Sequence, residues 1–242
     1  MALPKIDSPI YELTLPLSKK QVRYRPFLVK EQRNLMMAME SDSKETIEKN
    51  IKQVLHNCTL TENIDIDGLP IIDIEYYFIQ LRARSVGEVV DNKYRCENLV
   101  NENPCGNLME VKINLLDIQI TDTGIDKSEI QITDKIMIKL SYPKFSALDT
   151  VKNTESASDM AFEMILNSVE HIFDGEQFYY ANETSREELV DFIESLNQEQ
   201  FSRIEEFFDG LPTLNKKVEI DCNKCGFHHT IEVEGLENFF GS

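Results

Sequence analysis

The chain has 242 residues, of which 41% are hydrophobic and 28% charged, and this balance favours a folded globular protein over a disordered one. The formal net charge is −18, so nucleic acid and anionic membrane surfaces are not expected as partners. No apolar run approaches the roughly 20 residues that a membrane helix requires. The acidity has two interpretations that stay open, solubility alone or docking onto a basic partner.

No basic segment followed by an apolar one opens the chain, so no secretory signal is expected and a reducing compartment is predicted. Disulfides are rare in such compartments. The five cysteines are therefore predicted to be metal ligands or buried thiols.

The first third of the chain predicts a β-hairpin followed by helices. Alternating apolar residues on either side of a polar turn at 18–20 predict the hairpin within residues 10–28. Apolar residues at helical spacing predict helices over 31–40, 44–56 and 72–85. Gly87 is expected to end the last of these helices, and Cys58, just past the second, is expected to be a buried thiol.

The middle of the chain is rich in strand signals, and the last third returns to helices. Strands are predicted over 89–96, 109–120 and 130–142, the last with a turn at 133–135. Further on, the patterns predict a helix over 157–173, a short strand over 177–180, a helix capped by Thr184 or Ser185, a helix over 199–208 that Gly210 ends, and strands over 216–221 and 228–233.

These elements predict the α+β class. We expect a β-hairpin and helices at the N-terminus, central antiparallel strands, a helical insertion, and a split zinc-ribbon-like β element that joins mid-chain to C-terminus. The predicted domains are residues 1–88 with the hairpin and helices, residues 89–145 together with 213–242 as the zinc-ribbon-like domain, and residues 146–212 as the helical insertion.

Four cysteines fall into two similar segments. Cys222 and Cys225 are separated by two residues and followed by a glycine, which is typical of a zinc knuckle. Cys96 and Cys105 also precede a glycine, although six more residues separate them than in a standard knuckle. Strand-like residues enter and leave both segments. Cys96, Cys105, Cys222 and Cys225 are therefore predicted to bind one structural zinc ion as the two halves of a zinc ribbon.

The spacing leaves alternatives. The cysteines could be buried thiols, or His228 or His229 could replace Cys96 as a ligand, although both histidines are expected at the surface. A redox role for the CxxC pair is disfavoured because strand-forming residues follow it, where a thioredoxin-like unit has a helix.

Sequence motifs for catalysis are not found. The chain has no P-loop, GxGxxG, GxSxG or HExxH pattern, and its histidines show no triad order. Its 43 carboxylates leave room for a hidden catalytic pair, so a glycosidase-like site is not excluded. We expect a protein that binds other proteins and is not an enzyme.

Two segments carry a family resemblance. The first is Tyr24–Gln32 running into Leu35–Ser41, and the second is Asp73–Glu88. Together they resemble the T4-type bacteriophage base plate protein family, whose members include baseplate hub assembly proteins. The opening Leu3-Pro4-Lys5 and the overall length are also similar. The resemblance is strongest over residues 24–88 and weaker after about residue 145.

The resemblance implies a tail-assembly role, as an adaptor or chaperone that binds phage baseplate hub proteins. It implies a place in the host cell cytoplasm during assembly, with the virion tail baseplate as a second location. A permanent structural baseplate subunit is the main alternative, and a tail-associated cell-wall hydrolase is the least favoured one. The family supplies no catalytic residues to carry over.

The residues of these two segments have two interpretations. Their apolar side chains, among them Met36 and Met39, are expected in the core, but exposed methionines would give an adaptable binding surface. The charged residues fit either an internal ion-pair network or a docking face. Docking is favoured for Arg82 and Arg84, and the predicted partner-binding residues are Arg25, Lys30, Arg82 and Arg84.

Overall fold

The computed structural model describes residues 6–41, 43–121, 128–151 and 156–234. It shows a mixed α+β protein with several antiparallel sheets, as the sequence predicted. The chain forms two compact units. The first comprises residues 1–66, 72–121 and 213–242, and the second comprises 67–71 and 122–212. Within the described ranges, no helix is long and apolar enough to cross a membrane.

The first unit begins with a β-hairpin and continues with helices. Strands β1 (Tyr11–Thr14) and β2 (Gln21–Tyr24) pair antiparallel, with Leu13 opposite Val22. The helices that follow are α1 (Val29–Glu40), α2 (Lys44–Cys58) and α3 (Ile71–Ser85), close to their predicted bounds. Helix α3 buries Ile74, Tyr77, Phe78 and Leu81, so these apolar side chains of the second family-like segment lie in the core.

One buried carboxylate fixes the hairpin to α3. Asp73, in the first turn of α3, is fully buried and accepts hydrogen bonds from the backbone N–H groups of Leu17 and Ser18, at 2.8 and 2.9 Å. Buried carboxylates need such donors, because an unpaired buried charge is costly. The turn of the hairpin is thereby tied to a helix more than fifty residues away in sequence.

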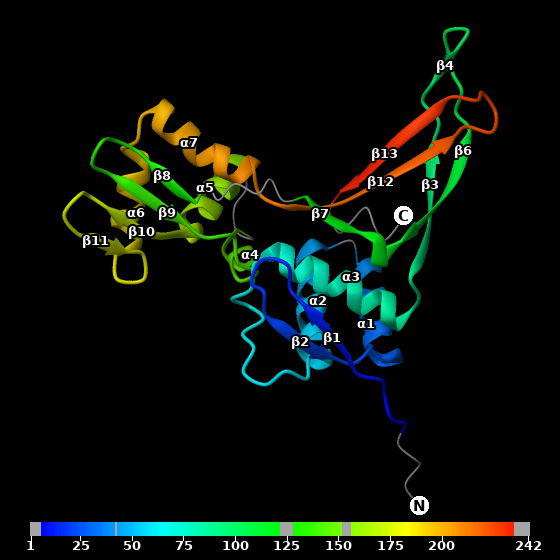
Figure 1. Ribbon diagram of the computed structural model, residues 1–242, viewed down its shortest axis with the longest axis horizontal. Coiled ribbons are helices and arrows are strands. Elements are labelled where there is room, and N and C mark those ends of the chain that lie inside the picture. The colour runs from blue at the N-terminus through cyan, green and yellow to red at the C-terminus, as the bar shows by residue number, and fades with distance from the viewer. Residues whose placement is uncertain (1–5, 42, 122–127, 152–155, 235–242) are drawn as a thin grey trace, which may run out of the picture. The chain divides into compact units, whose positions relative to one another are not determined.

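Two antiparallel β elements complete the first unit (Figure 1). Strands β3 (Val89–Arg95) and β6 (Leu108–Asn114) form a ribbon, and β4 (Leu99–Val100) pairs with β5 (Asn103–Pro104) at its end. The second element has the strand order β13-β12-β7. Its strands are β7 (Gln119–Thr121), β12 (Thr213–Asp221) and β13 (His228–Glu234), and a 3-10 helix, η1 (Leu115–Asp117), precedes β7.

A shared apolar core joins these elements. Val90 and Val111 of the ribbon pack in one cluster with Leu214 and Val233 of the second element and with Ile79 of α3. Residues from the middle and the end of the chain therefore form one folding unit, as the predicted split β element requires.

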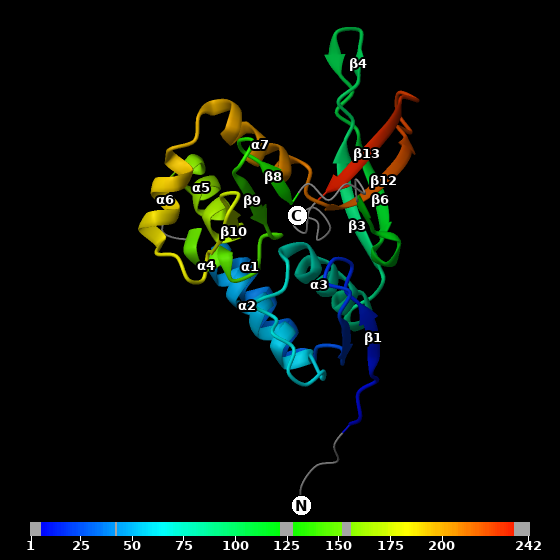
Figure 2. The same ribbon diagram turned by 60° about the vertical axis from the view of Figure 1, so that its left-hand side comes forward.

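The second unit is a four-stranded antiparallel sheet with helices on one face (Figure 2). The strand order is β11-β10-β9-β8. The strands are β8 (Glu129–Gln131), β9 (Met137–Leu140), β10 (Val169–Phe173) and β11 (Phe178–Tyr180), and the helices are α4 (Ala147–Val151), α5 (Ala157–Ser168), α6 (Arg186–Glu194) and α7 (Gln198–Asp209). Ser185, one of the two predicted caps, accepts the N–H of Glu188 and so caps α6.

The core of the second unit forms between one sheet face and α5–α7. Ile130, Ile138 and Ile172, from three neighbouring strands, pack with Leu189 of α6 and Ile204 of α7. The predicted helix over 157–173 is wrong in its last turn. It ends at Ser168, and residues 169–173 form β10, because Val169 and Ile172 bury their side chains in the sheet core.

The predicted domain boundaries can be compared with the two compact units of the structure. The strands predicted over 130–142 lie in the second unit with the helices of the predicted insertion, whereas 89–121 and 213–234 lie in the first. The division into three domains stays a prediction.

Candidate metal centre

The four predicted ligands come together in the first unit. The sulfur atoms of Cys96, Cys105, Cys222 and Cys225 all lie within 4.8 Å of one another. The Sγ atoms of Cys96 and Cys225 are 3.6 Å apart, and those of Cys105 and Cys222 are 3.8 Å apart. A disulfide requires about 2.05 Å, so these cysteines are not oxidised in pairs. The cluster is buried except for Cys225, which is partly exposed.

The two knuckles have equivalent backbone hydrogen bonds. In the first, the N–H of Gly106 donates to the carbonyl of Cys96, at 3.0 Å, and in the second, Gly226 donates to Cys222, at 2.8 Å. Both glycines have positive φ, +64° and +72°, a conformation that favours glycine over residues with a Cβ. The glycine that follows each cysteine pair was thus an informative sequence signal.

The extra residues of the first knuckle form a separate hairpin. Residues 99–104 make up β4, a two-residue turn and β5, and the N–H of Cys105 donates to the carbonyl of Asn98 at the base. Asn101 and Glu102, in the turn, have φ of 50° and 66°, which suits a tight hairpin turn. Figure 1 shows this hairpin at the end of the β3–β6 ribbon. Its removal from the sequence would leave Cys-Glu-Asn-Cys-Gly, a standard knuckle.

Polar groups surround the sulfur atoms. The side-chain amides of Asn98 and Asn107 donate to the sulfurs of Cys225 and Cys222, at 3.7 and 3.5 Å. The Nε2 atom of His229 lies 3.2 Å from the sulfur of Cys96. His229 is therefore beside the cluster, whereas His228 is exposed and contacts Asp221. The asparagines were missed in the sequence, because nothing in the spacing distinguishes them from other loop residues.

The local environment shifts the pKa values of the cluster thiols in different directions. Backbone hydrogen bonds, above all that from Cys225, lower the pKa of Cys222 to about 6. A hydrogen bond from the backbone of Phe227 is the main cause that lowers the pKa of Cys225. Burial raises the pKa of Cys96 to about 12. The lowered pKa of Cys222 and Cys225 favours the thiolate, which is the form that binds a metal.

The donor set fits zinc. Four thiolates around a tetrahedral zinc ion at about 2.3 Å place neighbouring sulfurs about 3.8 Å apart. The two distances that the structure gives, 3.6 and 3.8 Å, agree with this geometry. The arrangement therefore has the ligand number and the ligand type of a structural zinc site.

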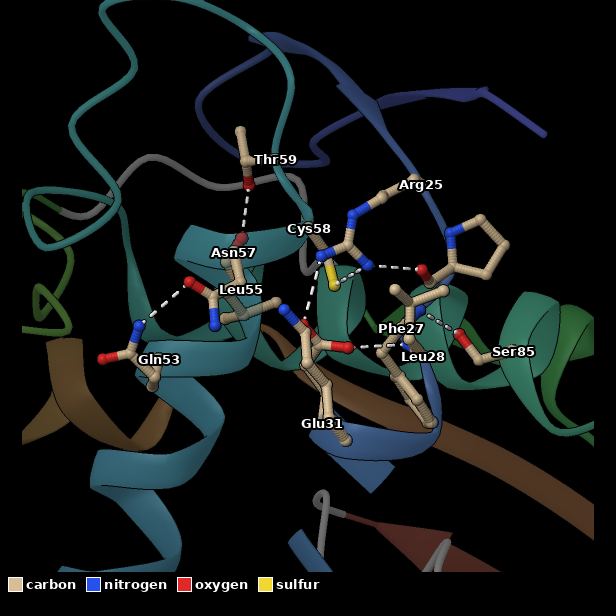
Figure 3. Close-up of polar contacts among 12 residues, drawn as sticks. Arg25, Phe27, Leu28, Glu31, Gln53, Leu55, Asn57, Cys58, Thr59 and Ser85 are labelled. Carbon is tan, nitrogen blue, oxygen red and sulfur yellow. Dashed lines mark hydrogen bonds and ion pairs between the residues drawn. The ribbon is translucent and has the colours of Figure 1, made fainter. Parts of the chain in front are cut away.

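The fifth cysteine belongs to a different site, the Arg25 network (Figure 3). The guanidinium of Arg25 donates to Glu31, to the carbonyl of Pro26 and to the sulfur of Cys58, at 3.1, 2.9 and 3.6 Å. Glu31 also accepts the N–H of Leu28, at 2.8 Å. Cys58 is fully buried, as predicted, and burial raises its pKa to about 11.

Among the predicted partner-binding residues, Arg25 is engaged inside the protein, with its side chain 18% exposed. Lys30 is 70% exposed and lies 3.5 Å from Glu31. Arg82 is partly buried, and burial lowers its pKa. Arg84 is at the surface, pairs with Glu88 at 2.7 Å and lies over the ring of Tyr11. A docking role for these residues stays a prediction.

The core assignment for the methionines of α1 is wrong. Met36 and Met39 are 56% and 54% exposed, and Met37 is 58% exposed. The side chains that α1 does bury are Glu31 and Ala38. An exposed group of methionines is the second interpretation that the sequence left open.

The Arg25 network leads to a prediction about pH. Burial by itself would raise the pKa of Glu31, but the hydrogen bonds from Leu28 and Arg25 and the charges of Arg25 and Lys30 outweigh it, so its pKa lies below the ordinary 4.5. A lowered carboxyl pKa stabilises the fold above about pH 4.5, and this contribution is lost as the pH falls through the folded-state value.

We therefore propose to measure the urea concentration at the unfolding midpoint as a function of pH. At pH values under 4.5, this midpoint should decrease more steeply with falling pH in the wild-type chain than in Glu31→Gln. Glu12→Gln, at an exposed ion pair, should follow the wild type and serves as the control. Parallel acid profiles for the wild type and Glu31→Gln would contradict the assignment.

Comparison with known proteins gives one match. A family model described as T4 bacteriophage base plate protein matches residues 8–241, nearly the whole chain. Among curated proteins and solved structures, nothing matches.

Proposed function

The chain belongs to the T4 bacteriophage base plate protein family, and from this premise we propose that it is a baseplate hub assembly protein that acts as an adaptor or chaperone. It would hold a hub subunit in an assembly-competent state until the next subunit docks. The observation that carries the proposal is the family match over nearly the whole chain. Its expected partners are the hub proteins of the same phage, and its expected location is the host cytoplasm during assembly.

Features of the first unit support binding over catalysis. Met36, Met37 and Met39 are each more than half exposed on α1, and methionine side chains adapt to different partner surfaces. The cluster offers four cysteine sulfurs, which is typical of structural zinc sites, whereas a catalytic zinc site keeps one position open. We propose that the chain is not an enzyme, and an assay on peptidoglycan would test the hydrolase alternative.

The alternative of a permanent structural subunit differs in a measurable way. Mass spectrometry of purified virions should detect a structural subunit in stoichiometric amount and an assembly chaperone not at all. Binding of the purified chain to individual hub proteins tests the proposal itself. If none of them binds, and a phage that lacks the protein still builds normal tails, the proposed function is wrong.

We also propose that Cys96, Cys105, Cys222 and Cys225 bind one structural zinc ion. When bound, zinc supplies a cross-link between two distant segments of chain and no reaction chemistry. The sulfur spacing, the matched backbone hydrogen bonds of the knuckles and the lowered pKa of the CxxC thiols support this assignment.

The equivalence of the knuckles gives a further prediction. Deletion of residues 99–104 should leave a standard knuckle and preserve one zinc ion per chain, because the hairpin contributes no ligand. Metal content by plasma mass spectrometry and a thermal melt would measure the effect. The same deletion with Cys105→Ser should lose the metal. A folded deletion variant without metal, beside a zinc-containing wild type, would contradict this prediction.

A further inference from the structure

Within the described residues of the second unit, the helices pack against one face of the sheet and leave the other face without a helix. Ile130, Ile138 and Ile172 bury their side chains against α5–α7. Because side chains alternate across a strand, their sequence neighbours lie on the opposite face. On this outer face the register places His171 between Lys139 and Tyr180, and Phe173 between Met137 and Phe178.

Aromatic rings gather where this face meets the sheet edge. We name His171, Phe173, Phe178 and Tyr180 the aromatic face. The rings of Phe173 and Phe178 have centroids 4.7 Å apart, and His171 contacts both Phe178 and Tyr180 edge-on, at 5.1 and 5.6 Å. Phe178 and Tyr180 lie on β11, the edge strand, and are 51% and 46% exposed. Two half-exposed aromatic residues held side by side on a sheet are typical anchors of protein interfaces.

The charge of the chain is concentrated in the same unit. Residues 67–71 and 122–212 contain 21 acidic and 7 basic residues, a net charge of −14 out of the total −18. Acidic residues also flank the hairpin that carries the aromatic face, with Glu170, Asp174 and Glu176 on β10 and the following turn. Aromatic rings bordered by carboxylates attract Lys and Arg side chains, through the ring faces and through charge.

We propose that the aromatic face is a docking surface for a basic protein partner, which inserts Lys or Arg side chains and an apolar anchor against Phe178 and Tyr180. This inference rests on the proposed function, since it supplies the binding surface and the chemistry of the partner. It also assigns a role to the negative charge of the chain. The sequence alone allowed two interpretations of that charge, solubility or docking onto a basic partner. Nucleic acid is disfavoured because the unit repels phosphate.

The test uses the full chain with its metal and the purified baseplate proteins of the same phage, each measured separately by biolayer interferometry at low and moderate salt. Phe178→Thr with Tyr180→Thr removes both anchors and keeps residues that favour strands. Glu176→Lys reverses one flanking charge. Glu205→Lys makes the same charge change at an exposed position of α7, and Leu99→Thr removes an exposed apolar side chain from the first unit.

The expected result is binding to a basic baseplate protein that weakens with salt. The double threonine variant should lose about tenfold or more in affinity. Glu176→Lys should bind more weakly than Glu205→Lys, and Leu99→Thr should bind as the wild type does. Circular dichroism checks that each variant is folded. If the double threonine variant is unfolded, the comparison of Glu176→Lys with Glu205→Lys tests the inference instead.

Other results would overturn the inference in distinguishable ways. A partner that binds all variants equally would remove the aromatic face as the surface and leave the proposed function intact. Self-association that the threonine variant abolishes would make a second copy the occupant. A wild-type chain that binds no baseplate protein would end the proposed function and this inference with it.

Discussion

Cys222→Ser is expected to reduce the zinc content of the purified chain from one ion per chain to almost none and to lower its melting temperature by about 10 °C or more. Cys222 is 1% exposed, and its sulfur lies 3.8 Å from that of Cys105 and accepts a hydrogen bond from Asn107. A serine hydroxyl does not ionise at neutral pH, so the site would lose a thiolate that zinc requires. Plasma mass spectrometry and calorimetry measure the two effects.

The size of this effect follows from the chain segments that the proposed zinc ion would hold together. Cys105 and Cys222 are separated by 117 residues. The length-dependent entropy of closing such a loop is about 4 kcal/mol, whereas structural zinc in small domains contributes on the order of 10 kcal/mol. The proposed zinc ion would therefore offset the closure cost, and the apolar contacts of β3 and β6 with β12 and β13 add to the stabilisation.

The fifth cysteine provides the matched control. Cys58 is equally buried but contacts Arg25 and lies outside the sulfur cluster. Cys58→Ser should keep one zinc ion per chain, whatever its effect on stability. A wild-type chain that is purified without metal and melts unchanged after treatment with a chelator would remove the zinc assignment.

Arg25→Ala is expected to destabilise the first unit by about 3–5 kcal/mol, because it leaves a buried carboxylate without its main cation. Glu31 is 2% exposed, and its other partners are the N–H of Leu28 and the more distant Lys30. Arg25 also binds the carbonyl of Pro26, so its loss affects the entry to α1. Urea unfolding, with the midpoint and slope determined separately, measures the change.

Lys30→Ala is the control for this prediction. Lys30 lies 3.5 Å from the same carboxylate, but its side chain is 70% exposed, so its loss should cost less than about 1 kcal/mol. Adding Glu31→Gln to Arg25→Ala should recover part of the loss, since a neutral amide needs no cation. Equal losses for Arg25→Ala and Lys30→Ala would show that burial of the pair is not the cause.

The cysteine cluster could be predicted from local pattern. A glycine after the second cysteine of each pair, with strand-forming residues on both sides, reports the backbone conformation that a knuckle needs, and this signal survives an insertion. The form of the insertion was not predicted. Residues 99–104 have too few apolar residues for a strand pattern, and their pairing is visible only once the ends of the hairpin are known to meet.

Tertiary contacts explain the two wrong predictions, for residues 169–173 and for the methionines of α1. Val169 and Ile172 continue an apolar pattern from α5, but they are β-branched, and β9 and β11 offer strand partners on both sides. In α1, the methionines suggested a buried stripe. The structure buries Glu31 there, because the partly buried Arg25, from the segment before the helix, supplies its counter-charge. A pattern of apolar residues carries no information about such a partner.

The order in which the ribosome releases the chain bears on the split cluster. Cys96 and Cys105 emerge well before Cys222, and at about 5–20 residues per second the interval is on the order of ten seconds. The buried core residues described in the second unit lie between Ile130 and Phe207, so all of them are synthesised before Cys222. The proposed zinc site can therefore be completed only after the intervening unit has been synthesised, because Cys222 and Cys225 follow it in the chain.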